Sequence, residues 1–137
     1  MMSKREEQAK HNEELCDHLL GLKKYNDWVV TTAFYAAIHY VEDAIFPHKV
    51  GHKEYPTFSH YFDGAGSRDN KHVTKHKLVV ERIPTAQADY KWLMDACSGA
   101  RYTDYLVSDA KAKQANEKLK KIRTACINAK LANALRL

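Results

Sequence analysis

One segment restricts the fold of this chain more than any other: the apolar stretch Trp28–Ile45. Hydrophobic side chains cover most of the circumference that this stretch would have as a helix. A helix that is apolar on nearly every side belongs at the centre of a bundle. Pro47 ends the segment, because proline has no backbone N–H and clashes with the preceding turn. The sequence therefore predicts a buried central helix that begins at Asn26 or Asp27, either of which can cap it, and ends near Phe46.

The central stretch does not have the composition of a membrane span. It contains Thr31, Thr32 and His39, whereas a span needs about 20 consecutive apolar residues. The first residues, MMSKREEQAK, are charged and lack the apolar core of a signal peptide. The cysteines are widely spaced and odd in number, which is typical of reduced core thiols. We therefore expect a cytoplasmic protein with no membrane contact.

Apolar periodicity and capping residues predict four further helices around the central one. Ser3 and Glu6 form a capping box that starts a helix ending at about Leu22. Asn70 caps a short helix, Lys71–Ile83, which the following proline stops.

Two predicted helices complete the chain. Thr85 opens the first, which Gly99 weakens before Arg101. The second runs from about Ser108 to Leu135. Its small and branched side chains alternate spacings of three and four, as in a packed seam: Ala112, Ala115, Leu119, Ile122, Cys126 and Ala129.

Residues 47–70 show no steady apolar period and combine proline, glycine, serine and aromatic side chains. We interpret them as a long loop with room for one short helical turn, and long loops in compact domains are often functional. No segment alternates as a strand would. The chain is therefore predicted to be one all-α domain over residues 1–137, a bundle of four to five helices.

The charge of the chain suits a polyanionic partner without requiring one. The formal net charge is +5 and the pI is about 9.1. Many of the basic residues lie on the last predicted helix. They form either a solvated face, which is the commoner case, or an electrostatic track for an RNA backbone. These residues are Lys111, Lys113, Lys118, Lys120, Lys121, Arg123, Lys130 and Arg136.

Four short motifs follow one another between His11 and about Tyr105. They are His11-Asn12-Glu13, Asp27-Trp28 with the run FYAAIHYVEDAI (34–45), His72 with Lys75 and Leu78-Val79, and Tyr90, Leu93 and Ser98 before Ala100-Arg101-Tyr102. In this order they resemble a subgroup of HEPN-like domains (higher eukaryote and prokaryote nucleotide-binding). The resemblance implies a helical bundle that binds or acts on RNA or nucleotides, in some cases within toxin or defence systems. It also implies a homodimer, or a partner protein such as a nucleotidyltransferase.

The standard catalytic motif of the larger family is absent. Its ribonucleases carry an arginine followed four to six residues later by histidine in a late helix. Arg5 and His11 have this spacing but lie in the first predicted helix, and no histidine follows Arg101. The subgroup also tends to have Arg-Asn where this chain has Lys75-His76, and lysine lacks the planar fork with which arginine binds phosphate.

His39 and Arg101 would be costly to bury without a partner. His39 is either a hydrogen-bonded core histidine or a general base or acid acting on RNA. Arg101 either pairs with Glu42, Asp43 or Asp104, or binds a phosphate.

The resemblance suggests one polar cleft between the second, third and fourth helices, with His39 and His72 as the catalytic candidates. Candidates for binding phosphate or nucleotide are Arg101, Tyr102, His11 and Lys75. His72 and His76 lie four residues apart and could share a zinc ion, but no third ligand is evident nearby. We therefore expect no metal and no cofactor.

Three kinds of function are compatible with these residues. The first is an RNA-directed protein with a non-standard site. The second is a non-catalytic module that binds a nucleotide or a partner protein, and the third is a structural homodimer. The fold alone does not choose among them, because function depends on the site.

Overall fold

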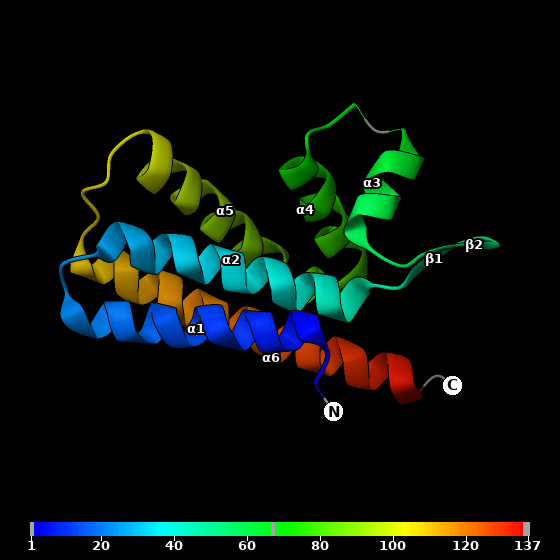
Figure 1. The fold of residues 1–137 in the computed structure, drawn as a ribbon, viewed down its shortest axis with the longest axis horizontal. Coiled ribbons are helices and arrows are strands. Elements are labelled where there is room, and N and C mark those ends of the chain that lie inside the picture. Colours follow the sequence, from blue (N-terminus) through cyan, green and yellow to red (C-terminus); the bar gives the residue numbers. More distant parts are fainter. Residues whose placement is uncertain (1, 67, 136–137) are drawn as a thin grey trace.

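The structure, a computed structural model, describes residues 2–66 and 68–135. Over these residues the chain forms six α-helices, one 3-10 turn and one two-stranded antiparallel hairpin. In chain order the elements are α1 (Lys4–Leu22), α2 (Asn26–Ile45), β1 (His48–Val50), β2 (Lys53–Tyr55), α3 (Phe58–Ala65), α4 (Lys71–Arg82), η1 (Pro84–Ala86), α5 (Gln87–Tyr102) and α6 (Asp109–Leu135). Helices α1, α2 and α6 lie side by side, with α5 and α4 crossing one side of α2 (Figure 1).

Helix α2 is the central helix of the bundle, as predicted. Twelve of its twenty residues are buried, and it contacts α1, α5 and α6. Ala37 and Val41 are fully buried and Ile38 is 8% exposed. The apolar circumference of this segment thus identified the core correctly. Over the described residues no helix is long and apolar enough to cross a membrane.

Two of the three predicted amino-terminal helix caps are present in the structure. The side chains of Ser3 and Asn70 accept hydrogen bonds from the backbone N–H groups of Glu6 and Val73, as expected. Neither candidate caps α2, which begins after Tyr25 without a side-chain cap.

The Asn26 side chain is used for a tertiary contact instead. Its Nδ2 donates to the Val107 carbonyl at 3.0 Å and to Asp109 Oδ1 at 2.8 Å. These bonds hold the connection between α5 and α6 against the turn between α1 and α2.

The chain is largely all-α, as predicted, but the described residues form six helices and not four to five, and the predicted loop at residues 47–70 contains a small hairpin and α3. Each strand has only three residues, which is too short for an alternating pattern to be recognised. Gly51, with φ of 63°, provides the left-handed residue that the tight turn requires. Thr57 caps α3 by accepting from the His60 N–H at 3.2 Å.

Aromatic side chains hold this segment together as a small second cluster. The ring of His48 lies 5.3 Å from that of Tyr61 and 6.1 Å from that of Phe46, and Phe46 also contacts Phe58. His48 is almost fully buried. The aromatic side chains of this segment therefore form a local core.

A buried carboxylate joins α1, α2 and α6. Glu13 is 4% exposed, and Tyr40 donates to its Oε1 at 2.6 Å. Its Oε2 accepts from Lys120 at 2.6 Å and from Arg123 at 2.7 Å. Burial acts to raise the pKa of Glu13, but the hydrogen bonds from Lys120 and Tyr40, together with the positive charges of Lys120 and Arg123, outweigh it and leave the pKa below its ordinary value.

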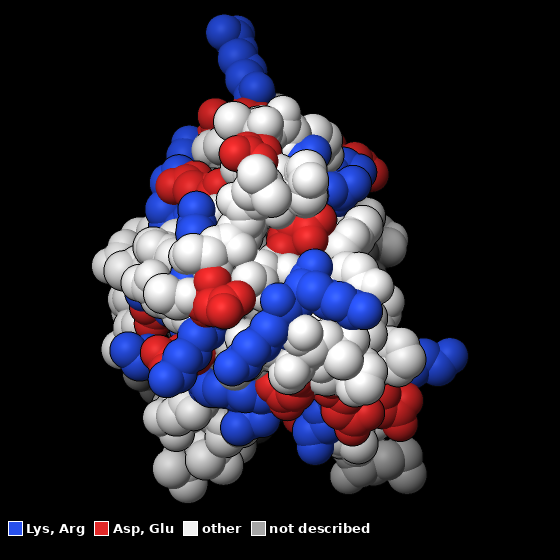
Figure 2. All heavy atoms as spheres, turned by 90° about the vertical axis from the view of Figure 1, so that its left-hand side faces the viewer, with Lys and Arg blue, Asp and Glu red and all other residues white. Residues whose placement is uncertain are grey.

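The basic residues of α6 mainly connect helices and do not form an open track. Besides Lys120 and Arg123, Lys118 pairs with Asp89 at 3.0 Å and Lys130 with Asp43 at 2.6 Å. On the face shown in Figure 2, Lys and Arg are interspersed with Asp and Glu. Half of the predicted track is thus committed to interhelical ion pairs, and Arg136 lies outside the described residues.

Candidate functional site

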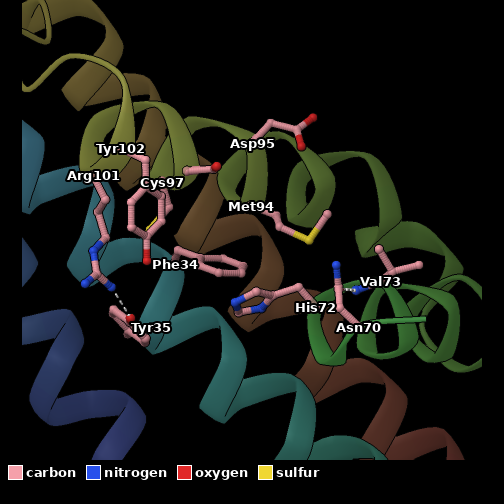
Figure 3. A pocket seen from close by; sticks show the side chains of 11 residues that line it. Phe34, Tyr35, Asn70, His72, Val73, Met94, Asp95, Cys97, Arg101 and Tyr102 are labelled. Carbon is pink, nitrogen blue, oxygen red and sulfur yellow. Dashed lines mark hydrogen bonds between the residues drawn. The ribbon is translucent and has the colours of Figure 1, made fainter. Parts of the chain in front are cut away.

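A pocket of about 280 Å³ lies between α2, α4 and α5. Arg101 and Tyr35 stand at one end, His72 and Asn70 at the other, and Phe34 lies between them (Figure 3). The apolar lining suits a flat ring, and the polar groups stand at its two ends. The remaining lining residues are Val73, Met94, Asp95, Cys97, Ser98 and Tyr102.

Arg101 is the positively charged residue that lines this pocket. It lies on the last turn of α5, because the helix continues past Gly99 to Tyr102. Its Nη1 donates to the Tyr35 hydroxyl at 2.5 Å. Its guanidinium carbon lies 6.0 Å from the Tyr35 ring centroid and 5.4 Å from that of Tyr102. The guanidinium thus stands beside two aromatic rings, and both Arg101 and Tyr102 are exposed.

Of the two alternatives for Arg101, the ion pair with Glu42, Asp43 or Asp104 does not form among the described residues. Glu42 pairs with Lys75 at 2.8 Å, and Asp43 pairs with Lys130. Asp104 accepts the backbone N–H of Leu106. Each of the three proposed partners is therefore used elsewhere, and the positive charge of Arg101 remains available to a ligand.

At the opposite end of the pocket, His72 packs its ring 5.6 Å from that of Phe34. Burial, and then the nearby Lys75, lower the pKa of His72. The imidazole is consequently neutral at pH 7 and can accept a hydrogen bond or a proton. Asn70 caps α4 beside it, so the amino end of this helix also faces the pocket.

His39 does not line the pocket. It lies on α2 with Nδ1 4.0 Å from Glu42 Oε2. Burial lowers the pKa of His39, Glu42 opposes this effect, and Lys75 adds to it. The structure therefore brings together His72, Arg101 and Tyr102 of the predicted cleft and leaves His39 outside it.

The two other predicted ligand-binding residues also lie apart. Lys75 is 8% exposed, pairs with Glu42, and has its ammonium 4.2 Å from the centroid of the Phe58 ring. Its charge thus fastens α4 to α2. His11 is exposed on α1 and does not line the pocket.

No family model matches the chain, and no curated protein or solved structure matches it.

Several pocket residues had no functional sequence signal. Phe34 and Tyr35 belong to the central apolar helix and were indistinguishable from core residues, although Tyr35 is 38% exposed. Asn70 was predicted only as a cap. Asp95 pairs with Lys91 at 2.7 Å across one helical turn, so its charge in the pocket is partly balanced.

The pair His72 and His76 does not resemble a metal site. His76 stacks on Tyr90 with ring centroids 6.2 Å apart, whereas His72 packs against Phe34. Among residues 2–66 and 68–135, no three His, Cys, Asp or Glu side chains are grouped to hold an ion.

Proposed function

We propose that the pocket between α2, α4 and α5 binds a phosphate-bearing ligand, a nucleotide or RNA, in keeping with the HEPN-like resemblance. The observation that carries the proposal is the state of Arg101, which has no carboxylate partner among the described residues and faces a concave site. Arginine matches the geometry of a phosphate with two parallel hydrogen bonds. The rings of Tyr35 and Tyr102 beside it offer surfaces on which a base can stack.

The effect of Arg101→Ala on binding tests this proposal. A hydrogen bond to a charged group contributes about 1.5–3 kcal/mol, so affinity should fall roughly tenfold or more. Arg101→Lys should restore part of it, because lysine keeps the charge but not the fork. The measurements are fluorescence anisotropy with a labelled single-stranded RNA, and calorimetry with adenosine monophosphate and with inorganic phosphate.

Lys121→Ala is the matched control, because it removes one positive charge at an exposed position of α6. It should leave affinity within about twofold of the wild type, allowing for weak long-range electrostatics. Equal weakening by the two variants would show that binding depends only on net charge. Wild-type affinity in Arg101→Ala would remove Arg101 from the site.

Any RNA cleavage by this pocket should depend on His72. His72 lines the pocket and is neutral, whereas His39 does not line it, which supports His72 as the base that would take a proton from a ribose hydroxyl. His72→Ala should therefore abolish cleavage of a labelled RNA, while His39→Ala should retain it. Full activity in His72→Ala would contradict this assignment, and binding without cleavage by the wild type would support a non-catalytic nucleotide-binding module.

A homodimer is the second proposal, and an exposed apolar end of the bundle favours it. Four large apolar or aromatic side chains are exposed there: Trp28, Tyr102, Tyr105 and Leu106. The hydrogen bond from Asn26 to the Val107 carbonyl holds the start of α2 against the connection between α5 and α6. Such patches mark association surfaces. We expect sedimentation velocity to show a dimer at micromolar concentration, and Leu106→Asp to shift it to the monomer. A wild-type monomer at high micromolar concentration would contradict the proposal and leave a partner protein as the alternative.

A further inference from the structure

We propose a second ligand site at the opposite end of the bundle, for a small amphipathic carboxylate, meaning an apolar chain or ring with one carboxylate. The end of α2, the hairpin, the end of α4 and the end of α6 lie at the same end of the bundle (Figure 1). Residues of these elements line a pocket of about 580 Å³. Its volume falls within the usual range for small-molecule sites. It shares no lining residue with the pocket around Arg101.

The floor of this second pocket is apolar. Ile45 and Phe46, at the end of α2, are 3% and 5% exposed and line it together with Pro47 and Ala134. These side chains come from segments far apart in the sequence, so the hollow is a product of the tertiary fold. An aliphatic chain placed here would leave water for an apolar surface, which is favourable in proportion to the area covered.

The cations at the rim differ in how strongly they are already engaged. Lys130 is held by Asp43 at 2.6 Å. Lys49 is well exposed and lies 3.8 Å from Glu54, a carboxylate that also lines the pocket and balances the charge of Lys49 there. Neither lysine is therefore the principal anion ligand.

Arg82 is the cation that remains for a ligand. It is half-buried at the end of α4, and its Nη1 lies 2.6 Å from His48 Nδ1. Since guanidinium nitrogens only donate, Nδ1 accepts and His48 is neutral with its proton on Nε2. This contact fixes the guanidinium in place. Among the described residues Arg82 has no ion pair and its contact is with His48, so its other N–H groups are available to a carboxylate.

The combination of floor and cation selects the ligand class. A planar guanidinium binds a carboxylate through two parallel hydrogen bonds, and the adjoining floor covers an apolar body. An uncharged apolar molecule would leave Arg82 unused, and a small anion such as acetate would leave the floor exposed. Both halves of the ligand should therefore be required.

The test uses octanoate as the probe, with octan-1-ol and acetate as its two halves, measured by ligand-observed NMR on the full chain. We expect saturable octanoate binding, with octan-1-ol and acetate at least tenfold weaker. Ala134→Trp should weaken octanoate at least tenfold by filling the pocket, and its exposed position should spare the fold. Ala110→Trp, exposed at the other end of α6, is the matched control and should bind as the wild type does.

Arg82→Ala should also lower the affinity for octanoate at least tenfold. If the loss of the Arg82–His48 contact disturbs the hairpin in that variant, Ala134→Trp still tests the proposal. Octan-1-ol binding as tightly as octanoate, wild-type binding in Ala134→Trp, or no octanoate binding would each overturn the proposal. Arg101→Ala should leave the affinity for octanoate unchanged. The experiment can therefore disprove the nucleotide site and the octanoate site independently of each other.

Discussion

The double variant Lys120→Met, Arg123→Met is expected to lose about 3–5 kcal/mol of unfolding free energy at pH 7. Methionine keeps the length of each side chain and removes its charge. Among the described residues, the buried Glu13 carboxylate would then keep only the Tyr40 hydroxyl as a hydrogen-bond donor. An ionised carboxylate in that position is costly because burial removes its hydration and no cation remains to compensate for the loss.

This loss should depend on pH in a defined direction. In the wild type the pKa of Glu13 lies below its ordinary value of 4.5, so its ionised form stabilises the fold above that pH and the contribution disappears as pH falls through the folded pKa. In the variant burial is no longer outweighed, the pKa of Glu13 rises, and protonation relieves the cost. The difference from the wild type should therefore narrow as the pH is lowered from 7 toward 4.5.

Urea unfolding followed by circular dichroism over this pH range measures both effects. The control is Lys111→Met, Lys113→Met, which makes the same change of charge at exposed positions of α6 and should stay within about 0.5 kcal/mol of the wild type. A similar loss in the control, or a difference that does not change with pH, would mean that the Glu13 network is not the cause.

Ile38→Ala is expected to cost about 2–5 kcal/mol, because it removes buried methyl and methylene groups from the central helix and leaves a cavity. Ile38 is 8% exposed and belongs to the main core cluster. Ile127→Ala, 46% exposed on α6, should change the unfolding free energy by only about 0.5 kcal/mol. Chemical unfolding of the two variants gives the comparison, and equal losses would contradict the placement of α2 at the centre.

The helical framework could be predicted because its signals are local. The burial of α2 follows from apolar side chains around one helix, and the caps at Ser3 and Asn70 follow from hydrogen bonds spanning three residues. The hairpin and α3 could not, because their strands are three residues long and their aromatic side chains pack against one another without a regular period.

The state of the charged residues could not be predicted, because their partners are distant in the sequence. Lys75 pairs with Glu42, and Lys130 on α6 pairs with Asp43, whereas the Arg101 guanidinium lies beside Tyr35. The same reason explains the basic residues of α6, whose carboxylates come from α1, α2 and α5. A pattern along one helix contains no information about side chains that reach it from others.

We propose above all that a phosphate-bearing ligand binds in the pocket between α2, α4 and α5. The most direct test of this proposal is a titration of isotope-labelled protein with adenosine monophosphate, followed through the backbone amide NMR signals. The account predicts saturable shifts at His72, Val73, Ser98, Arg101 and Tyr102, with none around Ala134 at the end of α6. Shifts centred elsewhere, or no shift at millimolar nucleotide, would contradict it.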